Sequence, residues 1–350
     1  MKKILVPAVL VLPFLWAAAA PRDRVEFRVG SDLELTKTFK LRTELSQDSL
    51  STLVNGNEAD MGDMEMNVVS DELTTVTDVY GAMAEGRPAK LKRTYDKLTN
   101  HTTVDLNHPM MGEKEMEYTG KSGLEGKTEV FALGDDGEYQ VAFAEGDKAD
   151  EELLSELWED MDLRLLLPKG EVKAGDTWKI EETSLAPLLA PGGNLKVLPE
   201  TEGNDMMGGA QPGMSEMLGE VHAQEATGTY VGTEERGGTT VGVIKLKLVK
   251  VKSAKDMTEF ARKALEAGGL QEGLEMSIDS ADVEIELDGE GELVWDLKGG
   301  HIHSLDLSGT LHFTQDSTAT MAMQGQKMKI ESTSEMSGSF TRSVALGASD

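Results

Sequence analysis

The chain has 350 residues, of which 63 are Asp or Glu and 34 are Lys or Arg, so its formal net charge is −29. Such an acidic chain lacks the basic face that releases counterions from a polyphosphate, which excludes nucleic acid as a partner. There is no cysteine, so disulfides, thiolate metal sites, a cysteine nucleophile and a lipid-modified cysteine are excluded as well.

Residues 1–20 have the order of a secretory signal peptide, with two lysines, an apolar run over 4–16 and alanines at 17–20. The alternative is a membrane anchor. The apolar stretch is shorter than the about 20 residues that span a bilayer, and Pro7 and Pro13 interrupt it. We therefore expect export from a bacterial cell and removal of residues 1–20. The mature chain is then expected in the periplasm or outside the cell, without a transmembrane anchor.

The next stretch alternates between apolar and polar residues. Most odd positions from Val25 to Leu45 are apolar, and the even positions from Glu26 to Glu44 are polar. Only a β-strand places alternate side chains on one face, so the stretch predicts one long strand or two joined near residues 30–32. One buried face and one solvated face are typical of an antiparallel sheet.

Similar alternating runs recur along the chain. Residues 124–133 and 138–143 flank a Gly-Asp-Asp-Gly turn, and residues 283–287 and 293–297 flank a second predicted turn at 288–291. The series continues over 305–313, 319–323 and 328–340. The sequence therefore predicts a mainly β fold of antiparallel meander sheets, arranged as a half-barrel or a sandwich.

Two short helices are predicted. The first covers residues 150–166, where apolar residues are spaced by three and four behind acidic residues 150–152. The second covers residues 256–267 and is stopped by Gly268 and Gly269. Residues 191–219 are rich in Gly, Pro and Met and predict a linker or insertion between an N-terminal domain (21–190) and a C-terminal domain (220–350).

The motifs that identify the commonest enzyme classes are missing. The sequence has no nucleophile elbow, no zinc-binding helix, no phosphate-binding loop and no dinucleotide fingerprint. We therefore predict no catalytic residue, no cofactor and no cofactor-binding residue.

Two histidines are the first candidate metal ligands. His301 and His303 are two positions apart, which in a strand places both on one face, close enough to share a metal. We expect that face to continue as the apolar stripe of residues 305–313. The alternative is two histidines at the rim of a sheet that hydrogen-bond to their neighbours.

Methionines are the second candidates, because thioethers bind Cu(I). The chain has 19 of them, and Met61, Met64 and Met66 lie in an apparent loop. The alternative is that they fill irregular apolar gaps, as methionine commonly does.

One stretch resembles a known family. The hairpin opening at residues 123–128 (GLEGKT), the predicted helix, Leu167-Pro168 and residues 172–178 (VKAGDTW) follow each other in this order. The order resembles an uncharacterised family of exported bacterial β-rich proteins that has no established activity. The resemblance implies a signal peptide and a β-rich body. From the residues themselves, Trp178 is expected to anchor the core while its indole N–H finds a carbonyl.

Three functions remain open. The first is an exported, non-catalytic binding or envelope-associated protein of unknown ligand. The second is a periplasmic carrier of lipid or another hydrophobic cargo, held by a curved sheet of long amphipathic strands. The third is a hydrolase of envelope material.

Overall fold

The computed structural model describes residues 22–59, 64–108, 112–146, 150–199, 214–268, 274–323 and 326–347. The predicted signal peptide, Met61 and residues 200–213 of the predicted linker at 191–219 lie outside these ranges. Among the described residues, no helix is both long and apolar enough to cross a bilayer.

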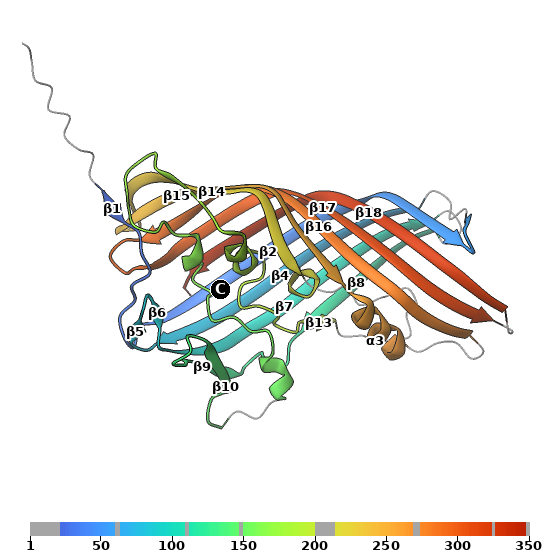
Figure 1. The fold of residues 1–350 in the computed structure, drawn as a ribbon, viewed down its shortest axis with the longest axis horizontal. Helices are drawn as coiled ribbons and strands as arrows, with labels where there is room; N and C mark the ends of the chain where they lie inside the picture. The colour runs from blue at the N-terminus through green and yellow to red at the C-terminus, as the bar shows by residue number, and fades with distance from the viewer. Residues whose placement is uncertain are drawn as a thin grey trace, which may run out of the picture.

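One 14-stranded sheet dominates the structure (Figure 1), and its paired strands are antiparallel. Its main path is β10-β9-β7-β4-β2-β18-β17-β16-β15-β14-β12, and β3, β8 and β13 pair beside it. The strands are β2 (Glu34–Val54), β3 (Asn57–Glu58), β4 (Glu65–Tyr80), β7 (Lys90–His108), β8 (Gly112–Lys121), β9 (Thr128–Leu133), β10 (Tyr139–Phe143), β12 (Thr177–Lys179), β13 (Leu198–Pro199), β14 (Glu220–Arg236), β15 (Thr239–Asp256), β16 (Leu274–Asp296), β17 (His301–Met323) and β18 (Gln326–Leu346).

Two small antiparallel pairs lie outside this sheet. They are β1 (Asp23–Arg24) with β11 (Glu171–Val172), and β5 (Met83–Ala84) with β6 (Arg87–Pro88). The mainly β, antiparallel fold predicted from the sequence is confirmed. The single curled sheet corresponds to the half-barrel of the two predicted arrangements.

The long strand β2 pairs with the last strand, β18, over most of its length. Strands from residues 21–190 and from residues 220–350 therefore belong to the same sheet, and the expected boundary at 191–219 is not a break between sheets. The two-residue period explains this architecture, because inward positions such as Ile285 are buried while Glu284 and Glu286 on the other face pair with Lys252.

The predicted turn at residues 288–291 is wrong, because β16 runs through it without interruption. The glycines there serve close packing instead of chain reversal. A Cβ at Gly289 would lie 3.1 Å from the ring of Phe340, and a Cβ at Gly291 would lie 2.3 Å from the carbonyl oxygen of Asp306. The predicted hairpin at 134–137 is confirmed by the pairing of β9 with β10.

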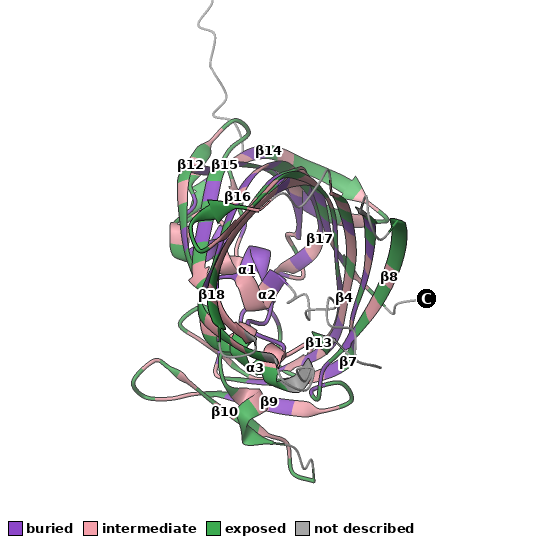
Figure 2. Cartoon of the chain, turned by 90° about the vertical axis from the view of Figure 1, so that its right-hand side faces the viewer, coloured by how far each residue is buried: buried purple, intermediate pink, exposed green. Residues whose placement is uncertain are grey.

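The curled sheet surrounds a segment without strands. Figure 2 shows α1 (Ala186–Leu189) and α2 (Met214–Met217) enclosed by the strands. We call residues 157–166, 184–197 and 214–217 the interior segment. Most of its residues are buried, and Met161, Leu166 and Leu185 are fully so.

The predicted helix at 150–166 is wrong. This region contains two 3₁₀ turns, η1 (Glu151–Leu154) and η2 (Arg164–Leu166); a third, η3, covers Glu182–Ser184. Glu156 and Leu163 have left-handed backbone angles, with φ of 63° and 56°, which interrupt an α-helix. The apolar side chains fill an interior that is surrounded by strands, so they need no single helical face.

The second predicted helix is confirmed as α3 (Thr258–Gly268), which packs against β16 (Figure 1). The Asp256 carboxylate accepts a hydrogen bond from the Thr258 backbone N–H at 2.8 Å and so satisfies a free donor at the helix start. The structure thus has three short α-helices in its described part, where the sequence predicts two.

Trp178 behaves as predicted. It lies on β12 opposite Gly228 of β14, and a Cβ at Gly228 would lie only 2.5 Å from the indole ring. The indole N–H donates to the carbonyl oxygen of Leu166 at 3.0 Å. Trp178 therefore ties the interior segment to the sheet.

Candidate functional site

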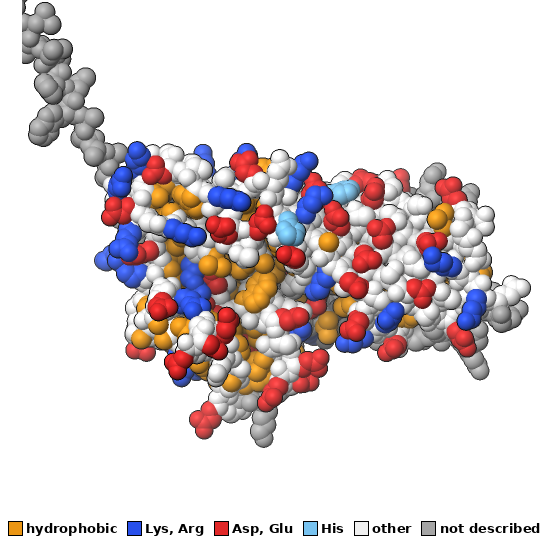
Figure 3. All heavy atoms as spheres, in the orientation of Figure 1, with side chains coloured by type: hydrophobic (Ala, Val, Ile, Leu, Met, Phe, Trp, Pro, Cys, Tyr) orange, Lys and Arg blue, Asp and Glu red, His pale blue; other side chains and the backbone are white. Residues whose placement is uncertain are grey.

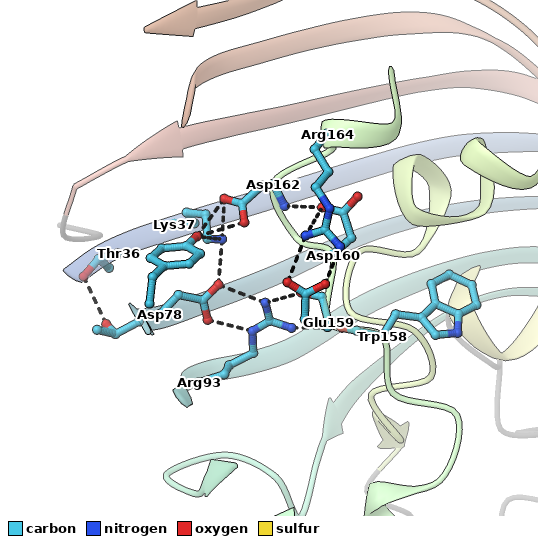
Figure 4. A network of polar contacts seen from close by, with 11 residues as sticks. Thr36, Lys37, Asp78, Arg93, Trp158, Glu159, Asp160, Asp162 and Arg164 are labelled. Atoms are coloured by element: carbon cyan, nitrogen blue, oxygen red, sulfur yellow. Dashed lines mark hydrogen bonds and ion pairs between the residues drawn. The ribbon is translucent and has the colours of Figure 1, made fainter. Parts of the chain in front are cut away.

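A cluster of charged side chains joins the sheet to the interior segment (Figure 4). We call it the buried charge cluster; it consists of Lys37, Asp78, Arg93, Glu159, Asp160, Asp162 and Arg164. The first three come from β2, β4 and β7, and the other four from one loop of the interior segment. Lys37, Asp78, Arg93 and Asp162 are fully buried.

Lys37 bridges the two sides of the cluster. Its Nζ lies 2.6 Å from Asp78 Oδ2 and 2.9 Å from Asp162 Oδ1. It also donates to the Tyr80 hydroxyl at 2.9 Å, and that hydroxyl donates to Asp162 at 2.8 Å. The ammonium group therefore has three oxygen partners, which offsets the cost of removing it from water.

Arg93 makes a second bridge. It holds Asp78 with two parallel hydrogen bonds of 2.8 and 2.9 Å and donates to the carbonyl oxygens of Trp158 and Glu159 at 3.0 and 2.9 Å. Burial by itself raises the pKa of the Asp78 carboxyl, but Arg93 and Lys37 together hold that pKa below its usual value. Asp78 is therefore an ionised counter-ion shared by two cations.

Arg164 completes the cluster within the loop. Its guanidinium pairs with Glu159 and lies 5.6 Å from the centre of the Phe27 ring. The cluster fixes the path of residues 158–164 against three strands. Its carboxylates are occupied by cations and backbone groups, so the arrangement fits an anchor rather than a catalytic centre.

Beyond this anchor the interior of the sheet contains a cavity of about 80 Å³, which we call the chamber. Most of the side chains that line it are apolar, including Met66, Val68, Phe313 and Met336 from the sheet and Met214 and Met217 from α2. Among the described residues of the lining, Glu72 is the one titratable side chain. A cavity with this composition fits an apolar ligand better than a charged one.

A second cavity of about 40 Å³, the inner cavity, lies between the sheet and the interior segment. Leu41 and Glu72 line both cavities, so the two adjoin. The inner cavity also contains the side chains of Asn100 and Arg342, which the chamber lining lacks. Glu72 accepts a hydrogen bond from the Met214 backbone N–H at 3.0 Å, which positions the start of α2.

The histidine prediction needs correction. The register between β16 and β17 shifts between Val294 and Trp295. These residues pair with Ser304 and Ile302, so His303 has no partner across the ladder. Ile302 is fully buried as a result, and the histidines do not continue the stripe of Leu305 as expected. His301 Nδ1 lies 2.8 Å from the Ile302 carbonyl oxygen. Within the described ranges, no three His, Asp or Glu residues gather to hold a metal.

The predicted methionine cluster is not brought together as a site of its own. Met66 lines the chamber, Met64 lies just before β4, and Met61 is outside the described residues. Copper binding therefore stays an untested prediction.

Sequence reasoning missed Lys37, Arg93 and Arg342, three buried cations. A signal was present for Lys37, which interrupts the apolar odd positions of β2. A charged residue in the buried phase of a strand indicates a buried partner.

Comparisons with known proteins assign no family. A scan against models of protein families and a search of curated proteins each find no match. Among solved structures, the outer membrane protein OprG from Pseudomonas aeruginosa is 10% identical and aligns over 89% of this chain and 97% of its own, with a TM-score of 0.21. An outer membrane channel from Pseudomonas putida is 8% identical over 92% and 97% of the two chains, with a TM-score of 0.22. Likenesses this low support no functional conclusion, and the resemblance of residues 123–178 to a family stays a prediction.

Replacing Lys37 by Met tests the anchor. The variant leaves Asp78 and Asp162 without one of their cations, and we expect a loss of about 3–5 kcal/mol in the free energy of unfolding, measured with urea. The control is Lys40→Met on the exposed face of the same strand, expected to change stability by less than about 0.5 kcal/mol. Equal effects of the two substitutions would contradict the role of Lys37.

Glu129 on β9 gives a prediction about pH. Its side chain is fully buried, neither carboxylate oxygen has a hydrogen-bond partner among the described residues, and burial raises its pKa from 4.5 to about 7. The folded state thus binds a proton more tightly than the unfolded state, and this group lowers stability as the pH rises from about 4.5 through 7.

We expect Glu129→Gln to remove this contribution. The difference in unfolding free energy between the variant and the wild type should rise by about 2 kcal/mol from pH 5 to pH 8. Urea titrations at both pH values measure it, with the exposed Glu138→Gln as the control. A difference that is the same at both pH values would show that Glu129 titrates normally.

Proposed function

We propose that this protein is an exported, non-catalytic binding protein that takes a hydrophobic ligand into the chamber inside its curled sheet. The observation that carries the proposal is the mostly apolar lining of the chamber, built from the inward faces of six strands and from α2. Protein interiors are normally packed to the density of organic crystals, so an apolar space next to two flexible methionines favours a ligand.

The outer face of the sheet is charged, which favours a ligand-binding site inside the sheet over one on its outside. Lys252 bridges Glu284 and Glu286 at 3.1 and 2.6 Å, and Lys247 pairs with Glu225 at 3.2 Å. Figure 3 shows acidic and basic side chains interspersed over the side of the molecule turned to the viewer, with hydrophobic side chains gathered in its left half. Alternating charges suit contact with water, so the apolar surface of the long strands is directed inward.

The chemistry of the chamber favours binding over hydrolysis. Hydrolysis by acid–base catalysis needs at least two positioned groups, whereas the described part of the chamber lining offers Glu72 alone. The carboxylates of the buried charge cluster are already paired with cations. Export rests on the predicted signal peptide at residues 1–20, which agrees with a carrier of hydrophobic cargo in the periplasm or outside the cell.

Filling the chamber tests the proposal. We expect the purified protein to bind octan-1-ol in isothermal titration calorimetry, and we expect Val68→Trp to weaken binding at least about tenfold because the indole occupies the space of the alkyl chain. Val69→Trp places the same side chain on the outer face of β4 and should leave the affinity unchanged.

Far-ultraviolet circular dichroism of both variants verifies that they fold. Absence of octanol binding to the wild type, or equal weakening by the two tryptophans, would refute the chamber as the binding site.

A further inference from the structure

Arg342 is a buried cation inside the sheet. It lies on β18 between Leu41 of β2 and Leu307 of β17 in the register, and both of these neighbours are buried and apolar. Only 5% of Arg342 is exposed, and its side chain contributes to the lining of the inner cavity. The guanidinium is therefore enclosed by the protein and close to the chamber.

No residue that the structure describes pairs with this guanidinium. Lys37 and Arg93 each contact a carboxylate, whereas Arg342 has neither a hydrogen bond nor an ion pair with any described residue. Glu72 lies two strands away, opposite Leu41, and acts on Arg342 only at longer range. Burial lowers the pKa of Arg342 to about 10, and the field of Glu72 offsets this only in part.

At a residue that is only 5% exposed the guanidinium loses most of its water, and a guanidinium that gains no partner among the described residues in return is costly. A site that meets an anionic ligand explains the cost, since the donors are then free for the ligand. The planar guanidinium forms two parallel hydrogen bonds with a carboxylate, a geometry that a lysine does not offer.

A second donor lies in the same cavity. The Asn100 side-chain oxygen accepts hydrogen bonds from Ser70 and Thr102, both at 3.0 Å, which fixes the orientation of the amide. The hydrogen bonds of the Asn100 side chain to described residues are those of its oxygen, so its NH₂ group is available, and Asn100 is only 7% exposed. The space of about 40 Å³ holds a few waters or one carboxylate group.

We propose that Arg342 and Asn100 bind the carboxylate head of an amphipathic ligand whose alkyl chain lies in the chamber. This rests on the proposed function and adds the class of ligand, a fatty-acid-like carboxylate. Because Leu41 and Glu72 line both cavities, one molecule can reach from Arg342 and Asn100 in the inner cavity into the chamber. A carboxylate places one negative charge near Glu72, whereas a phosphate monoester places up to two. The carboxylate therefore meets less repulsion from Glu72.

The test compares octanoate with octan-1-ol by isothermal titration calorimetry on the purified protein. We expect the wild type to bind octanoate at least about tenfold more tightly than octanol, because one charge-assisted pair is worth that much. Arg342→Met should bind both equally, with the affinity for octanol retained. The control is Arg42→Met, a neighbouring arginine whose side chain is 46% exposed and pairs with Asp71 on the outer face.

Stability separates a ligand site from a structural ion pair. Since Arg342 has no partner to leave behind, Arg342→Met should unfold at the same or a higher urea concentration than the wild type. A clear drop in the urea midpoint would assign Arg342 a structural role and overturn the proposal.

The binding results distinguish the carboxylate site at Arg342 from the proposed function of the chamber. Octanol binding without a preference for octanoate, or a preference that survives Arg342→Met, overturns the carboxylate site and leaves the chamber intact. Octyl phosphate binding more tightly than octanoate overturns the assignment of the head group. Failure of octanol and octanoate alike to bind overturns the site together with the function on which it rests.

Discussion

The ion pairs of Lys37 and Arg93 with Asp78 and Asp162 are the constraint on which the rest of the structure depends. A curled sheet of long strands has an apolar inner face that must be covered, and here a loop from the middle of the chain covers part of it. Removing charges from water is costly, so the cluster is stable only when each cation meets its carboxylate. The loop is thereby confined to one position along the strands.

The chamber follows from that position. The strands β16, β17 and β18 are 23, 23 and 21 residues long and extend past the loop that the cluster holds, so their inner faces are covered only in part. α2 with its two methionines lies where the coverage ends. The chamber is mostly apolar and the adjoining inner cavity contains the cation Arg342, two features that match the alkyl chain and the head of an amphipathic carboxylate.

Local patterns in the sequence predicted the local structure, and the distant contacts escaped them. Alternation over residues 25–45 identified β2 and showed Lys37 in the buried phase, but its partner Asp162 is 125 residues away. The spacing of the apolar residues over 153–165 resembles that of a helix, because an enclosed loop also needs apolar side chains on several sides. Gly289 and Gly291 suggested a turn, but glycine is needed there because Phe340 and Asp306 pack closely against the two positions. The cavities depend on how far the sheet curls, which no short pattern contains.

A ligand that lies inside the sheet contacts methionine methyl groups, and these groups report on it directly. Met66, Met214, Met217 and Met336 line the chamber, whereas Met83 and Met257 do not. In a protein labelled with ¹³C at the methionine methyl groups, we expect added octanoate to shift the NMR signals of the first four and to leave the other two unchanged. Unchanged signals of the four chamber methionines at saturating octanoate would contradict the account.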